Sequence, residues 1–244
     1  VYSGSTVGWT PASDIVSADE PTPPPTQKAI FGYGSGVTAI TNLVSSSGVV
    51  ATDTAGVGTA RANIAAAGYG SDKALFGYGY NGSTVVSMTN LVSNSGVVAT
   101  DTGGVGTARY GLAAATYGTD KAIFGYGNSG SATAITNLVS SSGVVASDVA
   151  GVGTARFNIA ASGYGSDKAI FGYGSVASPG LSMTNLVSNV GVVATDTSGV
   201  GTARRELAAA SYGGDKAIFG YGVISTQSSL TNLVSSSGVV SADV

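Results

Sequence analysis

The sequence predicts an all-β fold made of five copies of one unit, and two observations lead to this prediction. The heptad Lys-Ala-Ile-Phe-Gly-Tyr-Gly begins at residues 28, 121, 168 and 216, and a variant with Leu for Ile begins at residue 73. The copies are 45 to 48 residues apart, a period typical of stacked or circular arrays of one supersecondary unit. Around each heptad lie short apolar runs separated by Gly, Ser, Asn and Asp, which is the pattern of strands and turns.

Each unit contains four extended pieces, which the second copy shows completely. Piece A covers residues 64–70, piece B 73–79, piece C 88–93 and piece D 97–101. The Ala run in piece A is too short to nucleate a helix, and Gly follows it. Four short antiparallel strands in each of five units predict a five-bladed β-propeller with four-stranded blades. An open β-solenoid array is the alternative.

The sizes of the side chains predict where each piece lies in its blade. Piece A is nearly all Ala and Gly, which suits the crowded innermost position, while piece B carries the bulky Phe76 and Tyr78. We expect these rings to pack between the faces of neighbouring blades. Period-two alternation places Ala74, Phe76 and Tyr78 on one blade face and Leu75 on the other.

The first 27 residues differ from the rest of the chain. We interpret residues 1–27 as an N-terminal strand and a Pro-rich connector, followed by the five-repeat domain of residues 28–244. Three consecutive prolines favour polyproline II and exclude a central strand. Piece A occurs only four times, so the first unit lacks its inner strand. Because ring closure protects strand edges, we expect part of residues 1–20 to fill this vacancy.

An Arg, an Ala-rich strand, a Gly turn and then apolar-Phe-Gly-x-Gly together resemble the kelch repeat. Arg109, residues 113–115 and residues 124–127 give one example, and the resemblance covers residues 28–244. Two features depart from it: the kelch double glycine is here Gly-Tyr-Gly, and Asn-Leu-Val and Gly-Val-Val replace the kelch Tyr and Trp of the outer strands. With its near-identical copies, the chain looks like kelch-like proteins of phage and bacterial surfaces. This resemblance implies a structural or adhesive protein at an extracellular or virion surface.

The composition excludes several kinds of chemistry. Charged residues make up 9% of the chain, against a usual share of about 25%. The net charge of −3 provides no basic footprint for nucleic acid, and no apolar run approaches the roughly 20 residues that membrane insertion needs. Without Cys or His, the chain cannot form disulfides or the usual zinc and copper sites. We therefore expect no metal and no cofactor.

Charged residues recur at fixed positions of the repeat: an Asp ends piece D and an Arg precedes piece A. We predict structural ion pairs that fix one blade to the next, since Arg binds carboxylates with two hydrogen bonds. The pairs are Asp53 with Arg61, Asp101 with Arg109, Asp148 with Arg156, and Asp196 with Arg204. The alternative is a repeated Arg ring that binds an anionic ligand. The Asp-Lys pairs between pieces A and B, such as Asp72 and Lys73, suit a turn.

Variation between the copies is confined to two places, the pair after each Arg and the loop between pieces B and C. In an up-and-down meander both lie on the same face. Loops on a rigid scaffold favour binding, although neutral drift in exposed loops explains the same variation without function. The candidate ligand-binding residues are Tyr80, Asn81, Tyr110, Asn128, Phe157, Arg205 and Glu206.

No enzymatic activity is expected. A catalytic acid/base pair should break the repeat symmetry, and no His is present to act as a base. Our first hypothesis is a structural or receptor-binding propeller of a phage tail or fibre or a bacterial surface, which displays its variable face to a glycan or a surface protein. Such a protein fits a homo-oligomer or a larger virion assembly. The alternatives are a multivalent lectin with repeated saccharide sites and a glycoside hydrolase that uses Glu206.

Overall fold

The computed structural model describes residues 27–177 and 180–244, and every regular element in these residues is a β-strand. The all-β prediction is therefore confirmed. The strands are β1 (Gln27–Gly32), β2 (Thr41–Ser45), β3 (Ala65–Tyr69), β4 (Lys73–Gly77), β5 (Thr89–Val92), β6 (Ala113–Tyr117), β7 (Lys121–Gly125), β8 (Thr136–Val139), β9 (Ala160–Tyr164), β10 (Lys168–Gly172), β11 (Thr184–Val187), β12 (Ala208–Tyr212), β13 (Lys216–Gly220) and β14 (Thr231–Val234). This part of the chain contains no helix that is long and apolar enough to cross a membrane.

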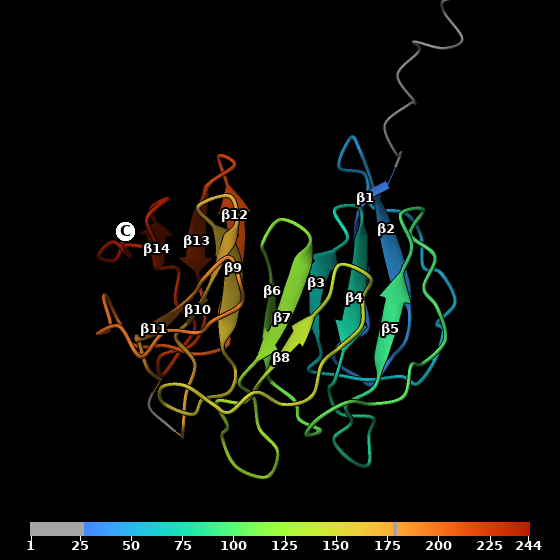
Figure 1. Ribbon diagram of the computed structural model, residues 1–244, viewed down its shortest axis with the longest axis horizontal. Helices are drawn as coiled ribbons and strands as arrows, with labels where there is room; N and C mark the ends of the chain where they lie inside the picture. The colour runs from blue at the N-terminus through green and yellow to red at the C-terminus, as the bar shows by residue number, and fades with distance from the viewer. Residues whose placement is uncertain (1–26, 178–179) are drawn as a thin grey trace, which may run out of the picture.

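The strands form five small antiparallel sheets, one for each copy of the heptad (Figure 1). The first sheet pairs β1 with β2, and the other four have three strands each, with piece B in the middle. In the second unit, Phe76 on β4 lies opposite Ala66 on β3 and Asn90 on β5. Pieces A, B and C are therefore strands, as predicted.

Piece D is not a regular strand. Piece D and the residue after it meet piece C at isolated bridges, Val92 with Val98 and Thr89 with Thr102. Between these bridges the Asn90 side chain bonds the main chain of piece D, because its Nδ2 donates to Ala99 O at 3.0 Å. The same Nδ2 also donates to Asp101 Oδ1 at 2.9 Å. Each of the second to fifth units thus consists of three strands and one bridged segment, not four regular strands.

The inner strands β3, β6, β9 and β12 lie side by side in chain order. Between the first two of them, Thr116 Oγ1 donates to Gly68 O at 2.9 Å, an approach that only small residues permit. Figure 1 shows the first and fifth units at opposite ends of this array. The N-terminal strand, the Pro-rich connector and the expected closure by residues 1–20 lie outside the described residues, apart from Gln27, which begins β1.

The same three side chains join every pair of consecutive units: a Tyr of one unit and a Phe and an Arg of the next. The rings of Tyr78 and Phe124 meet edge to face with centroids 5.1 Å apart, and the Arg109 guanidinium lies 4.3 Å from the Tyr78 centroid. All three side chains are fully buried. Such contacts are worth about 0.5–1.5 kcal/mol for the rings and about 2 kcal/mol for the desolvated cation. The other junctions contain Tyr33, Phe76 and Arg61; Tyr126, Phe171 and Arg156; and Tyr173, Phe219 and Arg204.

Tyr78 points to the opposite face of its sheet from the one that the alternation predicts. Phe76 packs on Tyr33 of the first unit, whereas Tyr78 packs on Phe124 of the third unit and shares a cluster with Leu75. The expectation that Phe76 and Tyr78 share a face is therefore wrong. The cause is local, because Tyr78 has a φ of +63°, in the left-handed region, and this reverses the strand alternation.

Candidate functional site

The variable positions come together at one end of the units. The residue after each Arg is bridged to the residue that directly follows the heptad of the same unit. Between Tyr110 and Asn128, for example, the two backbone hydrogen bonds measure 3.1 and 2.8 Å. The four bridged pairs are Ala62 with Tyr80, Tyr110 with Asn128, Phe157 with Ser175, and Arg205 with Val223. The meander argument correctly placed both variable sets on one face.

A second row of variable residues runs across the units beside these pairs. Gly111 N donates to Asn63 O at 3.1 Å, Asn158 N to Gly111 O at 2.7 Å, and Glu206 N to Asn158 O at 3.0 Å. All four residues are left-handed, with φ between +51° and +61°, a conformation that suits Gly and Asn better than Glu. We call the bridged pairs, this row and the loops after the heptads the loop face. The backbone row holds neighbouring units of this face in fixed register.

Two of the candidate side chains shape their own loops. Asn81 Oδ1 accepts from the main-chain nitrogens of Ser83 and Thr84 at 3.0 and 2.8 Å. Asn128 Oδ1 accepts in the same way from Gly130 N at 2.9 Å. These are side-chain-to-backbone turns of the kind that Asn favours. Their oxygens are therefore engaged within the loops.

The aromatic candidates are half-buried on the same face. Tyr80 closes its loop through a hydrogen bond from its hydroxyl to Gly82 O at 2.9 Å. Tyr110 and Phe157 each belong to a bridged pair and remain partly exposed. A partly exposed ring on a rigid backbone provides apolar contact area at a small cost in conformational entropy. Each of these three rings therefore keeps part of its surface open to solvent.

Arg205 and Glu206 form the charged part of the loop face. Arg205 Nε lies 3.4 Å from Glu206 Oε1, and Asn158 Nδ2 donates to the same oxygen at 3.1 Å. An exposed pair of this kind contributes little stability. No group of three His, Cys, Asp or Glu side chains suitable for a metal ion occurs in the described ranges.

Three residues of the bridged pairs were not among the candidates from the sequence: Ala62, Ser175 and Val223. A sequence signal for the last two exists, since each stands directly after its heptad, in the position of Tyr80 and Asn128. Aligning the units position by position, instead of selecting residues by type, identifies all three residues. The loop face therefore changes chemistry from unit to unit at equivalent places.

The arginines before piece A do not contribute to this face. Arg61, Arg109, Arg156 and Arg204 are fully buried in the junctions. Arg109 donates to Asn137 Oδ1 at 2.7 Å, to Tyr126 O at 2.7 Å and to Thr107 O at 2.9 Å. A guanidinium that is buried in a junction and hydrogen-bonded to residues around it cannot present its charge to an external anion. The structure thus supports the structural role and leaves no ring of exposed arginines.

The aspartates pair in a different register from the predicted ion pairs. Asp53 accepts from Asn42 at 2.8 Å, while Arg61 donates to Thr59 O, Met88 O and Asn90 Oδ1 in its own unit. The one such Arg–Asp contact within 4 Å in the described residues joins Arg204 to Asp243 of the same unit, at 3.5 Å. The expected pairing of an Asp with the Arg that follows it is therefore wrong. In a repeat, a residue has equivalent partners one unit away, so sequence order alone cannot select between them.

The aspartates that end piece D in the second to fifth units instead each fasten the beginning of their own unit; they are Asp101, Asp148, Asp196 and Asp243. Asp148 accepts from Thr107 N at 3.0 Å, from Thr107 Oγ1 at 2.7 Å and from Asn137 Nδ2 at 2.9 Å. Burial alone would raise the pKa of the Asp148 carboxyl, but the hydrogen bonds from Thr107 and Asn137 outweigh it, so the pKa is lowered. In the adjoining junctions, burial raises the pKa of Tyr126 and Tyr173 to about 12.

No family model matches the chain, and no curated protein matches it.

Proposed function

We propose that this protein is a non-enzymatic scaffold whose units are blades of the kelch-like propeller type, and that its loop face binds a glycan or a surface protein. The observation that carries the proposal is the contrast between constant junctions and variable bridged pairs. Arg109, Phe124 and Asn137 recur in equivalent, fully buried positions, whereas the pair of Tyr110 and Asn128 becomes Phe157 and Ser175 in the next unit. A constant interior with a varied rim suits the display of different contacts on one rigid frame.

The loop face also has the chemistry that such ligands require. Half-buried aromatic rings stack on the apolar faces of sugars or peptides, and the neighbouring amides and the Arg205–Glu206 pair supply polar contacts. We place this binding at an extracellular location, on a phage tail or fibre or a bacterial surface. The kelch-like pattern and the near-identical copies support that assignment.

The test is to probe a glycan array and a panel of bacterial cells with the labelled full-length chain. We expect binding that Tyr110→Ser or Phe157→Ser weakens by about tenfold, the equivalent of about 1.4 kcal/mol. Lys121→Ser, at the first residue of β7 and at the opposite end of the same unit, is the matched control and should bind normally. Loss of binding after periodate treatment of the cells would identify a glycan, and loss after protease treatment a protein. Absence of binding to both probes, or equal loss in the Lys121 variant, would contradict the proposal.

A multivalent lectin is the second candidate, because the bridged pairs place equivalent positions in four successive units. Titration calorimetry with a glycan from the array separates the two cases. A lectin with repeated sites should bind several saccharides per chain, and Tyr110→Ser should reduce that number by one without changing the affinity of the others. One saccharide per chain would favour a single composite site.

A further inference from the structure

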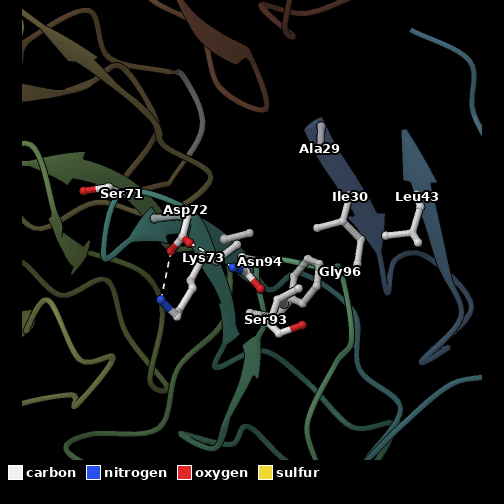
Figure 2. A pocket seen from close by; sticks show the side chains of 15 residues that line it. Ala29, Ile30, Leu43, Ser71, Asp72, Lys73, Ser93, Asn94 and Gly96 are labelled. Carbon is white, nitrogen blue, oxygen red and sulfur yellow. Dashed lines mark hydrogen bonds and ion pairs between the residues drawn. The ribbon is translucent and has the colours of Figure 1, made fainter. Parts of the chain in front are cut away.

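A hollow of about 390 Å³ lies between the first and second units, at the end opposite the loop face. Figure 2 shows it between Ile30 and Leu43 of the first unit and the turn that holds Ser71, Asp72 and Lys73 of the second. Its floor consists of small and apolar residues of the second unit, among them Ala66 and Phe76. The hollow has the position that an inner strand of the first unit would occupy.

The later junctions show what fills the equivalent space. There, alternate residues of the inner strand face the next unit, as Ala113, Ala115 and Tyr117 of β6 do toward the fourth unit. The Tyr ring reaches the turn between pieces C and D, where Tyr69 lies beside Gly143 and Tyr117 beside Gly191. At the corresponding Gly96, the three atoms nearest to an added Cβ all belong to Leu43, and no ring atom is among them.

The edge of β1 beside the hollow has no strand paired to it among the described residues. The middle strands β4, β7, β10 and β13 each pair on both sides, whereas β1 pairs with β2 alone among the described strands. An edge of this kind offers backbone N–H and C=O groups to an added strand. At the far end of the hollow, the main-chain oxygen of Asp72 is equivalent to that of Asp120, which accepts from Gly70 N at 2.7 Å.

The first unit also has the polar acceptors that an inner strand's Arg and Thr bind in later units, and they are already held together. In the third unit, Asn137 Oδ1 accepts from Arg109, and Asp148 accepts from Thr107; both donors precede the inner strand. The equivalent acceptors in the first unit are Asn42 and Asp53. They are held together by the same side-chain hydrogen bond, 2.8 Å long, without an Arg or Thr donor in the described residues.

We propose that the first unit is a binding site for an extended peptide segment with the inner-strand pattern. Another polypeptide supplies the segment in place of residues 1–20, which contain no Arg and so do not carry this pattern. The pattern is Thr-x-Arg, two further residues, Leu or Ile, three small residues, any residue and Tyr. The segment adds a strand to β1, its small side chains and Tyr enter the hollow, and its Arg and Thr bind Asn42 and Asp53. Since the acceptors are preformed and β1 has no second partner among the described strands, the ordering cost is that of the peptide itself.

The test uses a labelled peptide with the sequence of residues 106–120 and the full-length chain, with binding measured by fluorescence anisotropy. We expect saturable binding of one peptide per chain and none with a scrambled peptide. Replacing the peptide residue equivalent to Tyr117 or Arg109 by Ala should each weaken binding by about tenfold or more.

Two protein variants locate the site. Leu43→Arg places a charge where the peptide Tyr would pack and should abolish binding, whereas Leu233→Arg, at the same repeat position in the fifth unit, should not change it. Asn42→Ala should weaken binding of the parent peptide but should not weaken binding of the peptide in which Ala replaces Arg. The reason is that a double-mutant cycle shows coupling only between groups that contact each other.

Melting curves of the variants report whether each remains folded, and Asn42→Ala keeps the test decisive if Leu43→Arg does not. No saturable binding to the parent chain, equal loss with Leu233→Arg, or additive effects of the Asn42 and Arg changes would overturn the proposal. None of these outcomes depends on the loop face, so failure here is distinguishable from failure of the proposed function.

Discussion

The interior junctions and the two end faces of the array carry the same residue types but bury them very differently. Phe124 and Tyr126 are inaccessible to solvent, whereas Phe31 in the first unit and Tyr221 in the fifth expose 62% and 64% of their surface. All four residues stand in the same heptad, Lys-Ala-Ile-Phe-Gly-Tyr-Gly. The difference therefore comes from the neighbouring unit and not from local sequence, as expected of arrays stabilised by nearest-neighbour interfaces. Four matched pairs of substitutions test this comparison.

The largest difference is expected for the Phe position. Phe124→Ala should lower the free energy of unfolding by about 3–5 kcal/mol, because it leaves a cavity against Tyr78 and Leu75. Phe31→Ala should change it by less than about 0.5 kcal/mol, as for other exposed positions. Urea unfolding followed by circular dichroism measures both. Similar losses in the two variants would show that Phe31 has a buried partner.

The Gly of the heptad gives the next largest difference. A Cβ at Gly125 would lie 2.6 Å from the Phe171 ring, whereas a Cβ at Gly220 would meet only Thr231, at 3.5 Å. Gly125→Ala should therefore destabilise the protein by about 1–3 kcal/mol through overpacking, while Gly220→Ala should be neutral. Thermal unfolding of both variants gives the comparison. A stable Gly125→Ala variant would mean that the junction can widen without loss.

Removing the hydroxyl of the heptad Tyr should have a smaller effect on stability. Tyr78 Oη donates to Val105 O of the next unit at 3.1 Å, and the Tyr221 hydroxyl has no partner in the described residues. Tyr78→Phe should cost about 1 kcal/mol, the net value of one hydrogen bond, and Tyr221→Phe should have no measurable effect. If neither substitution changes the unfolding midpoint, this hydrogen bond does not contribute to the junction.

The smallest effect is a dependence of stability on acid. The pKa of Asp148 is lowered in the folded protein, so its stabilisation is complete above the unfolded pKa of about 3.9 and is lost as the pH falls through the lower folded pKa. Lowering the pH below about 4 should therefore lower the midpoint temperature of unfolding. Asp148→Asn should make that midpoint less dependent on pH and should also lower the stability at neutral pH. Asp53→Asn, which loses only the contact with Asn42, should lower neutral stability less. If the stability of Asp148→Asn falls with acid as steeply as that of the parent, the hydrogen bonds between Asp148 and Thr107 are not the source of the pH dependence.

The sequence predicted much of the fold because the repeat makes each pattern visible several times. The strands of pieces A, B and C, including the small inner strand of the second to fifth units, follow from period, residue size and turn residues. The variable loop face follows from simple meander geometry. The particular pairs, such as Phe157 with Ser175, needed the backbone bridges, because loop residues have no periodicity from which to infer register.

The sequence by itself determined the number of units, their strands and the absence of Cys and His chemistry, because composition and periodicity act locally. Only the tertiary structure decided which unit each side chain contacts. The left-handed Tyr78 turns its ring to the next unit, Arg109 bonds Asn137 instead of the preceding Asp101, and the Asn90 amide replaces the ladder of piece D. These choices depend on packing between near-identical neighbours, for which the sequence offers several equivalent partners and only the three-dimensional arrangement selects one.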